Sequence, residues 1–288
     1  MALILDGKKV RDEIAVRLAD QVARLKEQPG LAIIQIGDNS ASNTYIRQKK
    51  IFGEKIGVKV EHHKLAKTVA ASEVKKLIGK LNRDEKIHGI ILQFPVPAHL
   101  DANLLIEQID PGKDVDGLTA ANVKKLWTGD HYRPSGSVDG LVPATARGVI
   151  TLLDYYKISV EGKRAVVAGR SNLVGKPIAA LLLARGATVI ICHRGTLDLA
   201  AETKRAELII AAIGQPKLLR VEHFTMGAGQ VVIDVGISRD DDQLVGDVDF
   251  VAVEPLVAAI SPVPGGVGPL TVASLFANLF EAYKRQNN

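Results

Sequence analysis

The stretch over residues 162–185 constrains the fold more than any other part of this sequence. Residues 164–168 form a short, largely apolar run of the kind that is buried in a parallel strand. Gly169 ends that run, and Gly175 precedes an apolar helical segment over residues 178–184 that has a proline in its first turn. A strand, a glycine turn and a helix N-terminus favour an anion site, because free backbone N–H groups and the helix dipole point toward the ligand.

The residues after this stretch indicate which anion is bound. The glycine spacing alone is compatible with a dinucleotide site or with an ordinary strand-to-helix turn, since it is not the G-x-G-x-x-G pattern. The next predicted strand, over residues 187–192, ends at His193 and Arg194. NAD enzymes usually carry Asp or Glu there for the ribose hydroxyl, whereas an arginine suits a ribose 2′-phosphate. Arg170 adds a cation within the glycine turn, so the sequence favours NADP over NAD as the cofactor.

Two further predicted strands complete this half of the chain. They cover residues 208–213 and 230–235, and Gly214 and Gly236 follow them directly. Strands that end in glycine turns at helix-sized intervals are typical of a doubly wound α/β domain with a parallel sheet. Ligands bind at the carboxyl ends of such strands, so the residues of these turns are candidates for the cofactor site.

The first 120 residues predict a second parallel sheet. Predicted strands cover residues 31–36, 58–65 and 89–94, and predicted helices cover residues 7–27 and 72–81 and a segment that begins at Ser40 or Ser42 and ends at Ile56. The polar stretch over residues 128–140 is the best candidate for a linker. Further helices are predicted over residues 144–156 and 270–284. The fold class is therefore α/β, with two domains and a cleft between them.

Composition limits the class of protein and its surroundings. The 288 residues are 47% hydrophobic and 24% charged, which suits two globular domains with proper cores. The net charge of +5 comes without a block of like charges, so it suits polyanionic small molecules and gives no sign of a nucleic-acid tail. The single cysteine, Cys192, fits a reducing compartment. With no signal-peptide pattern and no membrane-length apolar run, we expect a cytoplasmic protein that contacts neither membranes nor nucleic acid.

A tyrosine and a lysine on one predicted helix are the first candidates for catalysis. Tyr45 and Lys49 are four residues apart and share a helix face. They can act as a proton-handling pair, because burial shifts the pKa of a lysine toward neutrality. The alternative is a solvated basic face, since Arg47, Lys50 and Lys55 lie on the same segment.

Three other segments carry candidate site residues. Gln93 ends an apolar strand, where it either faces a site or simply meets solvent. Asp114 and Asp116 lie in a Gly-rich turn, where a carboxylate either pairs with the N–H-rich edge of an aminopyrimidine-like ring or is solvated. Residues 261–271 combine prolines and glycines, which allow a close backbone approach to a ligand and a cis X-Pro bond, or form a hinge.

Metal and nucleophile chemistry find little support in the sequence. His62 and His63 have no Cys, His or acidic partner at a ligand spacing. Cys192 precedes His193, but adjacency in sequence is no sign of a catalytic Cys–His pair. We therefore expect no metal site and no nucleophilic cysteine.

Motifs along nearly the whole chain occur in the order of one known family. They are Gly37-Asp38 with Ser42-x-x-Tyr45-x-x-x-Lys49, Gln93-Phe94-Pro95-Val96-Pro97, Lys113-Asp114-Val115-Asp116-Gly117, Gly169-Arg170-Ser171-x-x-Val174-Gly175-x-Pro177, Ile233-Asp234-Val235-Gly236, Gly246-Asp247-Val248, and Pro262-Val263-Pro264-Gly265-Gly266-Val267-Gly268-Pro269. In this order they resemble the bifunctional methylenetetrahydrofolate dehydrogenase/methenyltetrahydrofolate cyclohydrolase family.

The resemblance implies two reactions on tetrahydrofolate derivatives in one-carbon metabolism. NADP-dependent oxidation converts 5,10-methylenetetrahydrofolate to the 5,10-methenyl form, and hydrolysis of that product gives 10-formyltetrahydrofolate. The resemblance also implies a homodimer and two domains. A folate-binding catalytic domain would cover residues 1–122 plus 270–288, and a Rossmann-like NADP-binding domain would cover residues 140–269.

The resemblance assigns roles to individual residues. Lys49 is the central acid/base residue, Tyr45 lines the folate, Gln93 supports Lys49, and Asp116 holds the pterin ring. The implied substrate-binding residues are Tyr45, Lys49, Gln93, Pro95, Asp116, Pro264, Gly265 and Gly266. The implied cofactor-binding residues are Gly169, Arg170, Ser171, Val174, Gly175, Arg194, Gly214, Gly236 and Ile237. No metal is implied.

The chain departs from the family pattern in places, and other functions stay open. The usual Pro-Cys-Thr-Pro-x-Gly is here Pro143-Ala144-Thr145-Ala146-Arg147-Gly148, Leu270 replaces a common methionine, and Arg194 stands where relatives often carry a serine. One alternative is a dehydrogenase with lost or weak cyclohydrolase activity. Others are a different two-domain NADP oxidoreductase of the shikimate dehydrogenase type, a nucleic-acid-binding module, and a folate- and nucleotide-binding regulator without catalysis.

Overall fold

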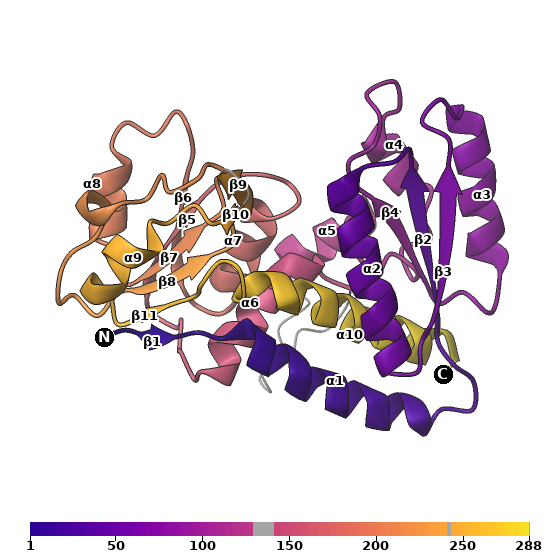
Figure 1. Ribbon diagram of the computed structural model, residues 1–288, viewed down its shortest axis with the longest axis horizontal. Coiled ribbons are helices and arrows are strands. Elements are labelled where there is room, and N and C mark those ends of the chain that lie inside the picture. Colours follow the sequence, from indigo (N-terminus) through magenta and orange to yellow (C-terminus); the bar gives the residue numbers. More distant parts are fainter. Residues whose placement is uncertain (129–140, 241–242, 288) are drawn as a thin grey trace. The chain divides into compact units, whose positions relative to one another are not determined.

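Two parallel sheets organise the chain in the computed structural model, which describes residues 1–128, 141–240 and 243–287 (Figure 1). The described residues divide into two compact units. The six-stranded unit contains residues 1–12 and 145–271, and the three-stranded unit contains residues 13–128, 141–144 and 272–287. The predicted linker lies outside the described residues from position 129 onward.

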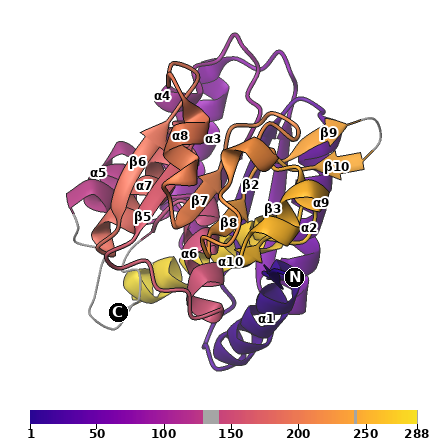
Figure 2. The same ribbon diagram turned by 90° about the vertical axis from the view of Figure 1, so that its left-hand side faces the viewer.

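The six-stranded sheet is parallel throughout, in the order β1-β11-β8-β7-β5-β6 (Figure 1). Figure 2 shows its strands β5, β6, β7 and β8 from a second side. Its strands are β1 (Leu3–Ile4), β5 (Arg164–Ala168), β6 (Thr188–Cys192), β7 (Leu208–Ala211), β8 (Val231–Asp234) and β11 (Ala259–Ile260). The central strands β7 and β8 are buried along their whole length, as expected for strands covered on both faces. The chain goes from β5 outward to β6 and returns to β7 on the other side of β5, which makes a topological switch point between β5 and β7.

Helices and a hairpin complete the six-stranded unit. They are α6 (Ala144–Tyr155), which begins one residue before this unit, α7 (Gly175–Ala184), α8 (Leu199–Lys204), α9 (Phe250–Val253), the 3-10 turns η1 (Val221–His223) and η2 (Glu254–Leu256), and the antiparallel pair β9 (Ser238–Asp240) and β10 (Gln243–Val245). Residues 178–182 of α7 are all buried, which explains why this helix is apolar on every face. The prediction of a doubly wound domain is confirmed.

The first strand joins the sheet of the later residues. Leu3 pairs with Ala259 and Ile4 pairs with Ile260, and Leu5 is fully buried. The N-terminal dozen residues therefore lie in the six-stranded unit, whereas residues 1–122 were expected to belong to the folate-binding domain. A strand of only two residues carries no alternation from which its sheet can be inferred.

The three-stranded sheet is also parallel, in the order β3-β2-β4. Its strands are β2 (Gly30–Ile36), β3 (Lys59–Leu65) and β4 (Gly89–Gln93), and its helices are α2 (Ser40–Lys55), α3 (Ala71–Arg83), α4 (Ala102–Ile106) and α5 (Ala120–Thr128), together with most of α1 (Gly7–Ala23) and α10 (Val267–Asn287). The predicted second sheet of three strand–helix units is confirmed. No helix within the described residues is both long enough and apolar enough to cross a membrane.

Side chains alternate along β2 between two packed faces. Ala32, Ile34 and Ile36 belong to one hydrophobic cluster with residues of α3 and α4. On α2, a side chain at Gly53 would overlap Val60, with its Cβ 2.5 Å from that residue's Cγ2, so this glycine allows helix and strand to approach closely.

The N-cap of α2 differs from the prediction. Asn39 has extended backbone angles, and its side chain accepts a hydrogen bond from the backbone N–H of Ser42. Neither Ser40 nor Ser42 is the cap, because an N-cap residue must itself lie outside helical backbone geometry.

Candidate active site and cofactor site

A buried lysine and a glutamine join α2 to the end of β4. Lys49 is only 8% exposed, and its Nζ donates a hydrogen bond to Gln93 Oε1 at 2.9 Å. The Gln93 side chain in turn donates to the backbone oxygen of Phe94 at 3.0 Å, and Ser42 Oγ donates to the same oxygen at 2.8 Å. Ser42 and Lys49 are two helical turns apart on one face of α2, so the helix is held against the strand end at two points. The solvated-face interpretation therefore does not apply to Lys49.

Asp116 is the carboxyl that acts electrostatically on this lysine. Burial lowers the pKa of the Lys49 amine, and the negative charge of Asp116 partly opposes that shift. Burial raises the pKa of Asp116, with Lys49 opposing the rise and Asp114 adding to it. An amine that releases its proton more readily and a carboxyl that keeps it more readily suit proton exchange near neutral pH.

The two carboxylates of the Gly-rich turn have different environments. Asp114 is 1% exposed and accepts hydrogen bonds from Thr119 N, Thr119 Oγ1 and Asn122 Nδ2, all between 2.8 and 2.9 Å. Asp116 is partly exposed, and no described residue donates a hydrogen bond to it. The Asp114 carboxylate is therefore used in stabilising the fold. The Asp116 carboxylate has no donor among the described residues and so can accept hydrogen bonds from a ligand.

A chain of hydrogen bonds holds the other side of α2. The Lys50 ammonium can only donate, so His62 Nδ1 accepts from it at 3.2 Å and His62 Nε2 carries the hydrogen. His62 Nε2 then donates to Gln35 Oε1, Gln35 Nε2 to Asn43 Oδ1, and Asn43 Nδ2 to Asp38 Oδ1, at 2.7 to 2.8 Å. Burial lowers the pKa of His62, and Lys50, Lys64 and His63 lower it further. Gln35 and Asn43 were not predicted, because nothing in the sequence around either residue distinguishes it from an ordinary polar residue.

Tyr45 and Pro95 also lie in the three-stranded unit. Tyr45 is 39% exposed, and burial of its ring raises the pKa of the phenol, which therefore stays protonated at neutral pH. The Phe94–Pro95 peptide bond is cis, directly after Gln93.

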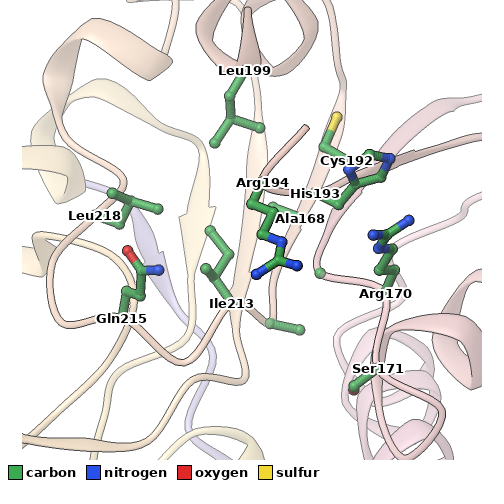
Figure 3. A pocket seen from close by; sticks show the side chains of 12 residues that line it. Ala168, Arg170, Ser171, Cys192, His193, Arg194, Leu199, Ile213, Gln215 and Leu218 are labelled. Atoms are coloured by element: carbon green, nitrogen blue, oxygen red, sulfur yellow. The ribbon is translucent and has the colours of Figure 1, made fainter. Parts of the chain in front are cut away.

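The six-stranded unit contains a cavity of about 570 Å³ at its switch point (Figure 3). Its walls come from the segments that follow β5, β6 and β7, the place where doubly wound domains bind dinucleotides. The lining residues are Ala168, Gly169, Arg170, Ser171, Cys192, His193, Arg194, Leu199, Ala212, Ile213, Gln215 and Leu218. Several of them were not predicted, although Ala212, Ile213 and Gln215 directly follow the end of a strand.

The turn after β5 needs its glycines for space. A Cβ on Gly169, whose φ is 133°, would lie 2.0 Å from the backbone oxygen of Ala212. A Cβ on Gly175 would lie 2.1 Å from the backbone oxygen of Gly169. Both contacts are far shorter than real Cβ contacts, so the turn accepts glycine alone at these positions.

The free backbone donors of the turn after β5 lie before α7 rather than in the first turn of that helix. Ser171 Oγ accepts hydrogen bonds from Val174 N and Gly175 N, and Pro177 has no N–H. The first turn of α7 therefore offers a ligand few donors of its own. Among the described residues, nothing accepts from the backbone N–H groups of residues 170–173. These successive N–H groups, rather than those of the helix N-terminus, are therefore the free backbone donors of the turn.

Two arginines carry the positive charge of the cavity. Figure 3 shows Arg170 and Arg194 on neighbouring loops of its wall, and both side chains are exposed. Thr196 Oγ1 accepts from His193 N, and His193 Nδ1 accepts from Gly195 N, so a tight turn holds Arg194 in place. Burial raises the pKa of the Cys192 thiol, which suits a structural cysteine and not a nucleophile.

The remaining cofactor candidates Gly214, Gly236 and Ile237 are not among the residues that line this cavity. The backbone N–H groups of Gly214 and Gly236 donate to the buried carboxylates of Asp247 and Asp234. Ile237 is 42% exposed and does not line the cavity.

The segment after β11 packs against the beginning of α1. Gly265 O accepts from Gly7 N at 2.9 Å and from Lys8 N at 3.2 Å, and a Cβ on Gly7 would lie 1.8 Å from Gly266 O. Gly265 and Gly266 are buried, whereas Pro264 is exposed and follows a cis peptide bond.

Comparison with known proteins identifies two domains in this chain. The model of the tetrahydrofolate dehydrogenase/cyclohydrolase catalytic domain matches residues 5–116, and that of the NAD(P)-binding domain matches residues 143–287. The bifunctional protein FolD of Lactobacillus delbrueckii subsp. bulgaricus is 45% identical, over 100% of this chain and 99% of its own length.

Solved structures show the same fold. The bifunctional FolD of Campylobacter jejuni has a TM-score of 0.94 at 41% identity, over 99% of both chains. The enzyme of Trypanosoma brucei, solved with NADP cofactor and inhibitor, has a TM-score of 0.92 at 34% identity, over 100% of this chain and 99% of that one. Shikimate 5-dehydrogenase of Thermus thermophilus reaches only 0.53 at 15% identity, over 90% of this chain and 100% of that one, which indicates a shared fold and no more.

Matches of this length and identity confirm the resemblance drawn from the ordered motifs. The chain belongs to the tetrahydrofolate dehydrogenase/cyclohydrolase family.

Proposed function

We propose that this chain oxidises 5,10-methylenetetrahydrofolate with NADP and hydrolyses the methenyl product to 10-formyltetrahydrofolate. The observation that carries the proposal is the Lys49 amine, buried, hydrogen-bonded to Gln93 and electrostatically coupled to Asp116. A buried lysine of lowered pKa is the group that proton transfer to and from folate nitrogen and water requires.

The cavity at the switch point fits NADP. The N–H groups of residues 170–173 suit a pyrophosphate, and Arg170 and Arg194 supply the charge for a further phosphate. We propose that Arg194 binds the ribose 2′-phosphate through parallel hydrogen bonds and so favours NADP over NAD. When bound, the cofactor accepts the hydride that leaves the methylene carbon, and the folate is left as the methenyl cation.

The folate is oriented by Asp116 and Tyr45. Asp116 offers two acceptor oxygens to the two parallel N–H groups on the aminopyrimidine edge of the pterin. Tyr45 shares a face of α2 with Lys49 and lies alongside the ring. Pro95, directly after Phe94 in the same unit, is the further proposed substrate contact.

Lys49 carries the proton transfers of the hydrolytic step. Its free amine accepts a proton from the water that attacks the methenyl carbon. The new hydroxyl then loses its proton while N5 gains one, the carbon–N5 bond breaks, and one proton is released overall. The lowered pKa keeps part of the lysine in the free-base form, and Gln93 directs its nitrogen.

Lys49→Ala tests this assignment. Turnover of methylenetetrahydrofolate with NADP is followed through reduced cofactor and methenyl absorbance together, and hydrolysis of preformed methenyltetrahydrofolate is measured separately. We expect hydrolysis to fall about a hundredfold or more. Arg47→Ala, an exposed residue of the same helix, is the matched control and keeps the wild-type rate. A Lys49→Ala protein that hydrolyses at the wild-type rate would exclude the proposed role, and methenyl accumulation in the wild type would indicate a dehydrogenase alone.

We further propose that the protein is a cytoplasmic homodimer. Strand β6 supports the dimer, because within the described residues no other strand pairs with its outer edge and Ile191 on it is 36% exposed. Light scattering on the purified protein tests this proposal, and a monomer at micromolar concentration would contradict it.

A further inference from the structure

Two buried carboxylates of the six-stranded unit have no part in the proposed chemistry. Asp234 ends β8 and is 3% exposed, and Asp247 lies between β10 and α9 and is fully buried. Charged side chains are rarely buried without strong compensating hydrogen bonds. Each of these carboxylates receives three of them, all from backbone N–H groups.

Asp247 binds the loop that follows β7. Its Oδ2 accepts from Ile213 N at 2.5 Å and from Gly214 N at 3.0 Å, and its Oδ1 accepts from Gln215 N at 2.9 Å. Successive backbone N–H groups around a residue of positive φ form an anion-binding concavity, and Gly214 has a φ of 77°. In this protein an internal carboxylate fills that concavity, at the end of a strand that flanks the switch point. The side chains of Ile213 and Gln215 line the cavity beside it.

Asp234 holds Asp247 in position. Its carboxylate accepts from Asp247 N at 3.1 Å, from Val248 N at 2.9 Å and from Gly236 N at 3.1 Å. Two glycines leave room for this contact. A Cβ on Gly236 would lie 2.2 Å from Asp247 Cγ, and a Cβ on Gly246 would lie 1.9 Å from Asp234 Oδ2.

The backbone around Asp247 binds a second part of the cavity wall. Gly246 O accepts from Lys217 N and Asp247 O accepts from Leu219 N, at 3.0 and 2.9 Å. Leu218, between these two donors, lines the cavity. Asp247 and its neighbours therefore fix the wall formed by residues 213–219, on the side of the cavity opposite the glycine turn of β5.

We infer that Asp247 is a positioning residue for the dinucleotide: its carboxylate shapes residues 213–215 so that they receive the cofactor, and Asp234 orients that carboxylate. The inference rests on the proposed cofactor site. It adds residues that touch neither cofactor nor folate but set the affinity for the cofactor. The hydrolytic step needs no dinucleotide, so the inference limits the effect of Asp247 to the oxidative step.

Asp247→Asn tests the inference, because the substituted amide has the same size but turns an N–H₂ group toward backbone donors. We expect KM for NADP to rise about ten- to a hundredfold, with kcat for oxidation and KM for the folate changed much less. Hydrolysis of preformed methenyltetrahydrofolate stays at the wild-type rate, which also reports that the variant is folded. Asp249→Asn, two residues further on and without a side-chain hydrogen bond among the described residues, is the control and behaves as wild type.

The outcomes separate this inference from the proposed function. An unchanged KM for NADP in Asp247→Asn would overturn the inference, and so would an equal loss of both activities, which indicates a general structural role. If Asp247→Asn does not fold, Asp234→Asn decides: a rise in the same KM supports the inference and an unchanged KM overturns it. A wild-type protein without saturable NADP turnover would instead refute the proposed function.

Discussion

Replacing Gln93 by glutamate places a negative charge beside the buried lysine and gives a sharp test of its role. The Gln93 Oε1 and Lys49 Nζ atoms are 2.9 Å apart, and Lys49 is 8% exposed. Two unit charges at that separation attract by about 6 kcal/mol at an effective dielectric constant of about 20. That energy corresponds to a rise of about four units in the pKa of Lys49. Desolvation of the new carboxylate reduces the effect, so we expect a rise of about two units or more.

The sign of the pH effect follows from the proton-accepting role of the free amine. A raised pKa keeps Lys49 protonated at neutral pH, and the fraction of free amine falls about tenfold for each unit. The acid limb of the pH profile of kcat/KM for methenyltetrahydrofolate hydrolysis therefore moves to higher pH. Gln93→Met removes the hydrogen bond without adding a charge, and its acid limb should not move upward. If the profiles of the two variants coincide, Lys49 is not the group that titrates in this step.

Two changes at the cofactor site complete the predictions. Arg194→Ser should lower kcat/KM for NADP about tenfold or more, because it removes charge-assisted hydrogen bonds to the 2′-phosphate. The value of kcat/KM for NAD, measured alongside, should stay unchanged. An equal loss with both cofactors would contradict the binding of the 2′-phosphate by Arg194. Gly169→Ala should abolish NADP binding in a calorimetric titration while hydrolysis persists, because the new Cβ would lie 2.0 Å from Ala212 O and displace the turn; wild-type affinity would show that the turn tolerates a side chain.

The ends of helices and strands were predictable where a residue such as glycine is required by the backbone conformation. Strand β5 begins and ends where it was predicted. Its apolar residues are followed by Gly169, a position at which no other residue fits because a Cβ would overlap the backbone oxygen of Ala212. Strand β1 was not predictable, because two residues carry no period. The N-cap of α2 was misplaced by one or three positions, since Asn39, Ser40 and Ser42 all have capping side chains and only the backbone angles distinguish Asn39.

The residue types of the candidate site were predictable, but the side chains and backbone groups to which those residues hydrogen-bond were less so. The burial of Lys49 depends on packing against β4, which no spacing within α2 reveals. Asp114 and Asp116 look alike in sequence, and they differ because Thr119 and Asn122 saturate only the first. Ser171 was expected to contact the cofactor; its Oγ accepts from Val174 N and Gly175 N, which leaves its O–H group able to donate to a ligand. For Lys49 and Asp114 the deciding partner lies outside the motif.

The hydrogen-bond chain from Lys50 to Asp38 has a direction, and that direction limits how this part of the protein can vary. Each of the three inner members, His62, Gln35 and Asn43, donates toward Asp38 and accepts from the Lys50 side, so the tautomer of His62 and the amide orientations of Gln35 and Asn43 are set by their neighbours. A substitution that reverses one donor leaves two acceptors or two donors facing each other further along. His62, Gln35 and Asn43, which lie on β3, β2 and α2, are therefore expected to change together. A relative that lacks one of these three residues is expected to have replaced the other two as well.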